Sequence, residues 1–314
     1  MAAAARLAAR SRPLSRPNPG VAALIVKDGV VVARGWTQPG GRPHAEAEAI
    51  ARAGDACRGA TLYVTLEPCA HKSARGPACA DLVSKAGLAR VVIGQHDPDP
   101  RTAGNGATQI RGAGIAVELL DDSTSRASLE GYLAVKQLGR PFVTLKLAMS
   151  LDGCIALANG ESQWITGETA RAHVHARRAR QDAILVGGGT WRADRPQLNV
   201  RLPGLEERSP QRILLTRGVA PDGVKVINDP QAISQLDGVQ YLYVEGGAET
   251  AAAFLKADLV DRMEIYRAPI VIGDGLRALG DIGLEQLAEA HGRWNLSEEC
   301  QLGSDRFTAY SRVR

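Results

Sequence analysis

The sequence predicts an α/β protein made of two domains. Short apolar segments alternate with helical segments along the chain, a pattern typical of mainly parallel sheets that helices cover on both faces. The chain has 314 residues, which is more than one hydrophobic core usually supports. Gly139-Arg140-Pro141 interrupts the alternation, so we expect the two domains to span residues 1–139 and 140–314.

The first region opens with a predicted hairpin, because apolar residues 21–26 and 30–33 flank the turn Lys27-Asp28-Gly29. The elements expected next are a helix over 45–52, a strand over 61–66, a helix from 79 to near 87, a strand over 90–94, a helix over 107–111, a strand over 115–119 and a helical stretch over 129–138. In the second region we expect strands over 142–147, 183–186, 213–215 and 241–244, a strand-rich segment over 262–272, and helices over 168–180 and 249–256.

One histidine, two cysteines and a glutamate in the first region form the pattern of a catalytic zinc site. His44 offers an imidazole, and Cys69 and Cys79 offer thiolates, which are ligands that suit zinc. Three protein ligands leave the fourth position to water, whose pKa zinc lowers to about 7. Glu46 stands two residues after His44, within reach of that water, and can shuttle its proton. The pattern resembles that of zinc nucleobase deaminases and predicts hydrolytic deamination.

The spacing of the two cysteines leaves an alternative open. Nine residues separate Cys69 from Cys79, where the general deaminase pattern has two. Free cysteines are commonly buried as small apolar residues, so the pair can also be structural. Because His44-Ala45-Glu46 and Glu67-Pro68-Cys69 occur in the expected order, the zinc interpretation is favoured.

Composition limits the partners of the protein. The formal net charge of +4 is too small to indicate nucleic acid, and the 4% of aromatic residues provide no obvious platform for stacking bases. The sequence has no run of eighteen apolar residues, so we expect no membrane span. Five cysteines without a disulfide-like spacing favour a reducing compartment.

The N-terminal segment has two interpretations. Residues 1–16 are rich in alanine and arginine and contain no acid, which is also typical of an organellar transit peptide. Because an apolar strand follows Pro17-Asn18-Pro19 almost at once, we expect instead an amphipathic helix that belongs to the domain. We therefore expect a bacterial cytoplasmic protein.

Two glycine-rich turns in the second region link strands to helices. Gly187-Gly188-Gly189 and Gly246-Gly247 would let a phosphate approach the backbone next to a helix N-terminus. A tight turn that needs positive φ explains them equally well. Neither has the G-x-G-x-x-G spacing of a dinucleotide fingerprint, so the alternatives stay open at this point.

Nearly the whole chain resembles the bifunctional deaminase–reductase family of riboflavin biosynthesis. The motifs of the first region that carry the resemblance are Pro17-Asn18-Pro19, Val26-Lys27-Asp28-Gly29, Pro43-His44-Ala45-Glu46, residues 59–69 and Asp97-Pro98-Asp99-Pro100. Those of the second are residues 144–148, 150–153, 160–166, 196–201 and Glu245-Gly246-Gly247. In that family a longer loop between the two zinc cysteines is usual.

The resemblance implies a cytidine-deaminase-like three-layer domain followed by a dihydrofolate-reductase-like domain. The first would use zinc to deaminate 2,5-diamino-6-(5-phosphoribosylamino)pyrimidin-4-one, and the second would reduce the ribosyl group to ribityl with NADPH. The implied partner is thus a small phosphorylated pyrimidine, with no nucleic acid and no membrane. The resemblance also implies that copies of the chain assemble into a homo-oligomer.

Site residues are carried over by motif. In the deaminase half, Glu46 is the proton shuttle, His44, Cys69 and Cys79 hold zinc, and Asn18 and His71 line the pyrimidine pocket. In the reductase half, the residues expected at the dinucleotide are Ala148, Trp164, Thr190, Asp194 and Gly247. Those expected at the substrate are Lys146, Ser162, Arg178, Leu198, Arg201 and Glu245. Guanidinium groups of Arg178 and Arg201 match phosphate oxygens.

Some of these residues have structural alternatives. Trp164 can be core packing, Arg178 a solvated helix arginine, and Lys146 a snorkelling side chain at a strand end. No role is predicted for Cys57, Cys154 and Cys300.

Three positions of the reductase half depart from the family pattern. Cys154 stands where lysine or arginine is usual, Arg195 where a second acid is common, and Thr216-Arg217 where aspartate and serine are usual. These departures motivate one alternative, a deaminase with a degenerate, scaffolding reductase domain. A nucleic-acid adenosine deaminase is the other alternative, and it would normally show a more basic surface.

Overall fold

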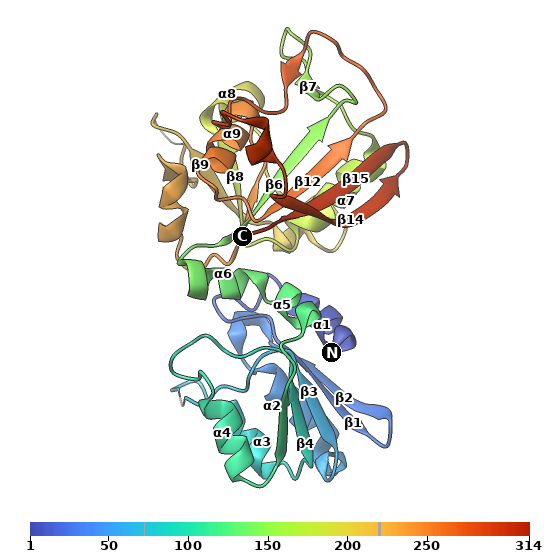
Figure 1. Ribbon diagram of the computed structural model, residues 1–314, viewed down its shortest axis with the longest axis vertical. Coiled ribbons are helices and arrows are strands. Elements are labelled where there is room, and N and C mark those ends of the chain that lie inside the picture. Colours follow the sequence, from blue (N-terminus) through green and yellow to red (C-terminus); the bar gives the residue numbers. More distant parts are fainter. Residues whose placement is uncertain (72, 219–220) are drawn as a thin grey trace. The chain divides into compact units, whose positions relative to one another are not determined.

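The structure is a computed structural model that describes residues 1–71, 73–218 and 221–314. The chain folds into two compact units, Met1–Gly139 and Arg140–Arg314, which Figure 1 colours from blue to green and from green to red. Each unit has its own sheet and its own buried apolar core. No helix within the described ranges combines the length and the apolar character that a membrane crossing requires.

A five-stranded sheet with the order β2-β1-β3-β4-β5 forms the centre of the first unit. Its strands are β1 (Ala22–Lys27), β2 (Val30–Trp36), β3 (Thr61–Val64), β4 (Arg90–Ile93) and β5 (Ala116–Leu119). β1 runs antiparallel to β2 and β3, whereas β3, β4 and β5 are parallel. The predicted hairpin is confirmed, and the parallel arrangement holds only from β3 onwards.

The helices of the first unit form two groups. They are α1 (Ala2–Ala8), α2 (Ala45–Ala53), α3 (Cys79–Lys85), α4 (Asn105–Gly112), α5 (Ser123–Ser128) and α6 (Glu130–Leu138). Contacts join α2, α3 and α4 in one group and α1, α5 and α6 in the other, and these groups cover the two faces of the sheet (Figure 1). α1 buries Ala4, Ala5 and Ala8 and contacts β1 and α5, as expected of a helix that belongs to the domain.

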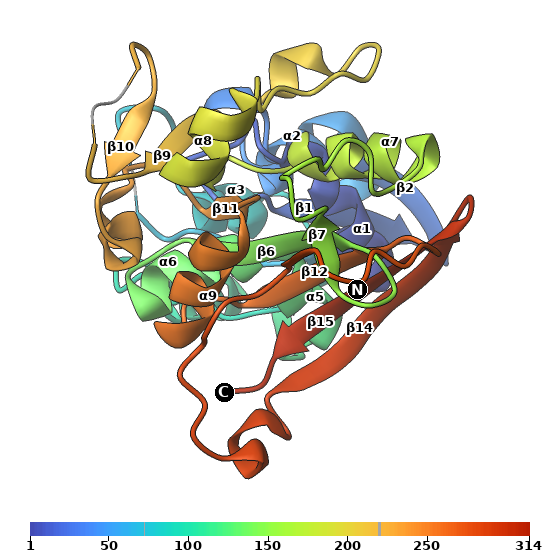
Figure 2. The ribbon, with the colours of Figure 1, turned by 90° about the horizontal axis from the view of Figure 1, so that it is seen from above.

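An eight-stranded sheet with the order β10-β9-β8-β11-β6-β12-β15-β14 forms the centre of the second unit. Its strands are β6 (Phe142–Met149), β8 (Ala183–Gly187), β9 (Gln211–Leu215), β10 (Lys225–Ile227), β11 (Tyr241–Val244), β12 (Arg262–Arg267), β14 (Trp294–Leu302) and β15 (Asp305–Arg312). Neighbouring strands are parallel through β10, β9, β8, β11, β6 and β12. β15 then pairs antiparallel with β12, and β14 pairs antiparallel with β15 to form a hairpin. Figure 2 shows this hairpin at the edge of the sheet. A small ribbon pairs β7 (Cys154–Ala156) with β13 (Leu276–Arg277).

Both faces of this second sheet are buried. Leu185 belongs to one apolar cluster together with Phe254 of α9 (Ala248–Lys256), while its neighbour Ile184 belongs to the other with Val174 of α7 (Glu168–Arg178). Since successive side chains of a strand point to opposite faces, α9 and α7 cover opposite sides. The third helix, α8 (Gly188–Asp194), follows β8 directly.

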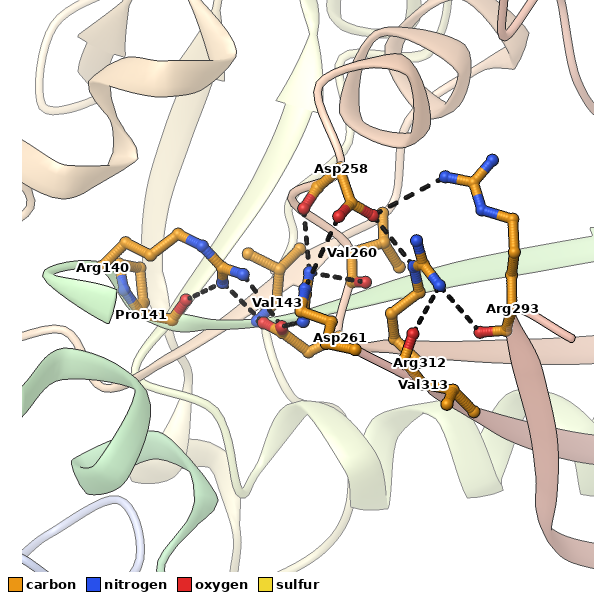
Figure 3. Close-up of polar contacts among 10 residues, drawn as sticks. Arg140, Pro141, Val143, Asp258, Val260, Asp261, Arg293, Arg312 and Val313 are labelled. Atoms are coloured by element: carbon orange, nitrogen blue, oxygen red, sulfur yellow. Dashed lines mark hydrogen bonds and ion pairs between the residues drawn. The ribbon is translucent and has the colours of Figure 1, made fainter. Parts of the chain in front are cut away.

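An arginine–aspartate network holds the beginning and the end of the second unit together (Figure 3). The Asp261 carboxylate accepts two N–H bonds from Arg140, at 2.6 and 2.9 Å, and one from the Val143 backbone at 2.8 Å. The C-terminal Arg314 also pairs with Asp261. Asp258 pairs in turn with Arg293, Arg312 and Arg314.

Candidate zinc centre and reductase site

The three predicted zinc ligands converge in the first unit. His44 Nδ1 lies 3.6 Å from Cys69 Sγ and 3.3 Å from Cys79 Sγ, and the three ligand atoms lie within 4.8 Å of one another. A tetrahedral zinc with bonds of about 2.0–2.3 Å separates its ligands by about 3.3–3.8 Å. The donor set and its spacing therefore fit zinc, and the structural alternative for the two cysteines is not favoured.

Secondary structure places each ligand. His44 is the N-cap residue of α2, Cys69 follows β3 in the chain, and Cys79 is the first residue of α3. The backbone N–H of Cys79 donates to Cys69 Sγ at 3.3 Å, which ties the two cysteine segments together. Hydrogen bonds from the Cys79 side chain and from His44 lower the pKa of Cys69 to about 4. A thiolate, the form that binds metal, is thereby favoured at Cys69.

Glu46 lies beside the ligands and is buried. Only 3% of its surface is exposed, and this burial raises the pKa of Glu46 to about 7, with a smaller contribution from Cys69 and an opposing one from His44. A carboxyl group with a pKa near neutrality can both take up and release a proton at physiological pH. The structure thus brings a proton carrier to the ligand set without making it a ligand.

A cavity of about 340 Å³ opens onto His44, Cys69 and Glu46 and is also lined by Asn18 and His71. Asn18 is held in place by its Nδ2, which donates to the Gly41 carbonyl at 2.8 Å and lies 3.2 Å from His44 Nε2. Nδ1 of His71 is buried and finds no hydrogen-bond partner among the described residues. An unpaired buried nitrogen in a cavity wall is a feature of a site that receives a polar ligand.

Sequence reasoning missed part of this cavity wall. Arg42, Arg75, Asp97, Asp99, Arg101, Tyr132 and Lys136 also line it. The Asp97-Pro98-Asp99-Pro100 motif supported the resemblance, but no role was predicted for its acids. Tyr132 and Lys136 lie on α6, far along the chain from the zinc motif, and no local pattern pointed to them.

In the second unit, Lys146, Arg178 and Glu245 come together. Arg178 binds both carboxylate oxygens of Glu245, at 2.6 and 2.9 Å, and Lys146 Nζ lies 3.6 Å from Glu245. Burial alone would raise the pKa of Glu245, but the charges of Arg178 and Lys146 lower it to about 2. Arg178 is therefore not a solvated helix arginine, and that structural alternative is wrong.

The segment that carries Leu198 and Arg201 is anchored to α7. Arg178 donates to the Asn199 carbonyl at 3.0 Å, and the Arg201 N–H lies 3.2 Å from His175 Nδ1. Leu198 is buried at 3% exposure and belongs to the apolar cluster of that face. His175, to which the sequence assigned no role, thus joins the predicted substrate residues.

The two glycine-rich turns also meet. The backbone N–H of Gly247 donates to Thr190 Oγ1 at 3.1 Å, which links the turn before α9 to α8. None of these glycines has positive φ; instead, a Cβ at Gly187 or Gly246 would lie 2.1 or 2.4 Å from Thr250 atoms. The tight-turn alternative is therefore wrong for these positions, and Gly187 and Gly246 are the glycines that allow the close approach of Thr250.

The remaining predicted residues are more dispersed. Ala148 lies on β6, and Trp164 is 62% exposed with the Arg171 guanidinium 4.8 Å from its ring, so core packing is wrong for Trp164. Ser162 is half-buried and Asp194 is exposed at the end of α8. Within the described part of the chain, no hydrogen bond or ion pair connects either of them to the Glu245 cluster.

The departures from the family pattern have ordinary structural settings. Cys154 is fully buried in β7 with its thiol 3.6 Å from the Gly273 carbonyl, and Arg195 is exposed in the left-handed C-cap of α8. Thr216 Oγ1 accepts the Gly218 N–H at 3.1 Å.

Hydrolytic deamination is the chemistry that an imidazole and two thiolates on zinc, with an adjacent carboxyl, support. The first unit defines a zinc-dependent deaminase, and it is followed by a second α/β domain. Residues 1–95 match the cytidine and deoxycytidylate deaminase zinc-binding region, and residues 141–306 match the RibD C-terminal domain. The chain belongs to the RibD family of riboflavin biosynthesis proteins.

Similarity to this family extends over both units. The chain is 38% identical to the RibD protein of Escherichia coli, with 92% of each chain covered, and 40% identical to that of Corynebacterium ammoniagenes, with 85% and 84% covered. A solved Acinetobacter baumannii RibD matches with a TM-score of 0.87 and 34% identity over 100% of this chain and 99% of that one. A deaminase/reductase structure from Thermotoga maritima matches with a TM-score of 0.85 and 30% identity over 99% and 97%.

The family confirms the predicted fold class, a cytidine-deaminase-like domain followed by a dihydrofolate-reductase-like domain. The protein is a bifunctional enzyme of riboflavin biosynthesis, with zinc and NADPH as its cofactors. Neither a nucleic-acid deaminase nor a scaffolding reductase domain is favoured, because the relatives match across both halves.

Proposed function

We propose that the chain performs two successive reactions on one phosphorylated pyrimidine. Residues 1–139 deaminate 2,5-diamino-6-(5-phosphoribosylamino)pyrimidin-4-one, and residues 140–314 then reduce its ribosyl group to ribityl with NADPH. The similar Thermotoga maritima protein is a diaminohydroxyphosphoribosylaminopyrimidine deaminase and 5-amino-6-(5-phosphoribosylamino)uracil reductase, which supports this pair of activities. The observation that carries the proposal is the convergence of His44, Cys69 and Cys79 beside a cavity that His44, Cys69 and Glu46 line.

Deamination requires a water molecule, a proton carrier and a held ring. Zinc bound by His44, Cys69 and Cys79 would lower the pKa of a water to about 7. Glu46 takes a proton from the attacking water and passes it first to the ring nitrogen and then to the departing ammonia. Asn18 and His71 line the same cavity and orient the pyrimidine there.

Reduction requires orientation of two partners, since the hydride belongs to NADPH. The turns at Thr190 and Gly247, which the Gly247 N–H joins, stand next to helix N-termini where the dinucleotide can approach the backbone, and Ala148, Trp164 and Asp194 contribute further contacts to it. Lys146, Ser162 and Leu198 flank the substrate.

Arg178 and Arg201 have different roles in substrate binding. Among the described residues, Arg178 uses three of its five N–H groups on Glu245 and the Asn199 carbonyl, which leaves two for substrate. Arg201, which is exposed at its side chain, is the better placed cation for the phosphate. Glu245 stays ionised beside these cations and can accept a hydroxyl of the sugar chain.

The proposal also covers the oligomeric state of the enzyme and its location in the cell. We propose that the enzyme forms homo-oligomers, as the family resemblance implies, and that it acts in the bacterial cytoplasm, since the RibD proteins of Escherichia coli and Corynebacterium ammoniagenes come from bacteria. Light scattering coupled to size exclusion would give the assembly state, and a single-chain mass would contradict it.

Mass spectrometry of the products tests the two reactions. Purified protein, zinc and the diaminopyrimidine ribosyl phosphate are incubated with and without NADPH. Exchange of an amino group for an oxo group without NADPH, and a gain of two hydrogens only with it, is the expected result. Deamination without any reduction would contradict the second half of the proposal, and an unchanged substrate would contradict the first.

A further inference from the structure

The last helix of the first unit contributes directly to the deaminase cavity. Tyr132 and Lys136 are four residues apart on α6, so they share one face of the helix. Both side chains line the cavity that is also lined by His44, Cys69 and Glu46. The zinc-binding family match ends at residue 95, so neither the helix nor the segment of Asp97 and Asp99 belongs to the matched region.

The two side chains hold two acids of the same cavity wall. The Tyr132 hydroxyl donates to Asp97 Oδ1 at 2.6 Å, and Lys136 Nζ donates to Asp99 Oδ2 at 2.9 Å. Arg101 adds two N–H bonds to Asp99, at 2.9 and 2.7 Å. The backbone N–H of Asp99 closes the group by donating to Asp97 Oδ1 at 2.9 Å.

Two buried acids in the loop of residues 97–101 are unfavourable unless groups outside this loop stabilise them. Asp97 and Asp99 are only 6% and 4% exposed and stand two residues apart. Buried acids need charge or hydrogen-bond partners, and two neighbouring carboxylates repel each other. Arg101 comes from the same loop, whereas Tyr132 and Lys136 are fixed on a helix and can impose a position on it.

Asp97 keeps an acceptor for a ligand. Its hydrogen bonds within the described ranges all use Oδ1 or the backbone, so Oδ2 is left as an acceptor. A carboxylate oxygen in a cavity wall binds a hydroxyl or N–H donor, and the proposed substrate carries both kinds beyond its ring. Asp97 can bind such a donor only if the loop of residues 97–101 keeps its position relative to the segments that carry the zinc ligands.

We propose that Tyr132 and Lys136 are positioning residues of the deaminase site, which fix the Asp97–Asp99 loop against the cavity so that α6 is part of the substrate-binding wall. The inference rests on the proposed deamination for its substrate. It assigns to α6 control of substrate affinity and not of the proton transfer at Glu46.

Steady-state deamination by full-length Tyr132→Phe and Lys136→Met tests the inference. Each variant removes one hydrogen bond to a carboxylate, so KM for the diaminopyrimidine ribosyl phosphate should rise about five- to tenfold, with kcat within about twofold of wild type. Zinc content should stay the same. Lys136→Arg, which keeps a charged donor, should restore most of the affinity, and Lys85→Met, at an exposed lysine of α3, is the matched control.

Hydrogen–deuterium exchange supplies a readout that does not depend on activity. Residues 97–101 should exchange faster in Tyr132→Phe and Lys136→Met, while the segments around His44 and Cys79 keep wild-type protection. Unchanged KM and unchanged exchange in both variants would overturn the inference. A loss of zinc together with a fall in kcat and a rise in KM would overturn it too, because this result would indicate a merely structural role. If the wild type itself does not deaminate, the proposed function fails, and the exchange result still decides whether α6 positions the loop.

Discussion

At the scale of single residues, Glu46 is the group whose replacement separates metal binding from chemistry. Glu46→Gln keeps the shape of the side chain but cannot carry a proton, so deamination should fall by about 10²–10⁴-fold. Zinc should remain, because Glu46 is not among the three converging ligands. Metal analysis together with product mass spectrometry measures both properties.

Glu48→Gln is the matched control for that variant. Glu48 lies on the same helix and pairs with Arg52 at 2.8 Å, outside the cavity wall, so its replacement should leave deamination unchanged. Loss of zinc in Glu46→Gln, or deamination at the wild-type rate, would show that the role proposed for Glu46 is wrong.

Glu245 makes the stability of the second unit sensitive to acid. Its pKa is lowered from 4.5 to about 2 by Arg178 and Lys146 despite burial. A lowered pKa stabilises the folded state above the unfolded value, and that contribution is lost as the pH falls from about 4.5 to about 2. The free energy of unfolding of Glu245→Gln should therefore change less over this window than that of wild type.

Tryptophan fluorescence during urea unfolding at pH 5 and pH 3 measures this difference. Three of the four tryptophans, Trp164, Trp191 and Trp294, lie in the second unit, so the emission reports mainly on it. Glu249→Gln, at an exposed position of α9, is the control. An equal acid dependence in wild type and Glu245→Gln would rule out the ion cluster as its source.

At the scale of elements, the two glycine-rich turns depend on close approach. A Cβ at Gly246 would lie 2.4 Å from Thr250 Cβ, a contact that no rotamer of Thr250 relieves. Gly246→Ala should destabilise the second unit by about 1–3 kcal/mol and weaken NADPH binding. Gly189→Ala, where the new methyl group meets no packed neighbour within 4 Å among the described residues, should change stability by less than about 0.5 kcal/mol.

Urea unfolding and NADPH titration of the two alanine variants make this comparison. Equal effects of Gly246→Ala and Gly189→Ala would contradict the account of the turn. Neither Gly246 nor Gly189 has positive φ, so backbone strain gives no reason for the two alanine variants to differ in stability.

Elements with strong local patterns could be predicted from the sequence, and those without could not. The β1–β2 hairpin, α2 and the strand over 241–244 follow from apolar segments, turn residues and helical spacing. The β14–β15 hairpin was not predicted, although Trp294, Leu296, Cys300 and Leu302 alternate with polar residues; most residues of β14 are exposed, so this strand has no well-buried apolar face. Its place beside β12 depends on pairing with a strand about forty residues away.

At the scale of the whole molecule, the integrity of the second unit depends on Asp261. This carboxylate, 5% exposed, binds Arg140 near the beginning of the unit (Figure 3) and Arg314 at its end. Asp261→Asn breaks a buried ion pair and should destabilise the second unit by about 3–5 kcal/mol. Deamination should persist under conditions in which reduction is lost, because the first unit has a separate core.

Measuring both activities after incubation at rising temperature tests this prediction. Asp274→Asn, at an exposed aspartate of the same unit, is the control. Simultaneous loss of the two activities in Asp261→Asn would contradict independent cores.

The sequence by itself determined the zinc chemistry and the class of fold. The ligands and Glu46 stand in short motifs whose residue types dictate the chemistry, and the alternation of strands and helices is a local property of the chain. Only the tertiary structure decided what completes each site. Tyr132, Lys136 and His175 reach their sites through packing of distant segments, and the burial that raises the pKa of Glu46 exists only once the cavity has formed. Contacts across long sequence separations leave no periodic pattern, so they become visible only when the chain is folded.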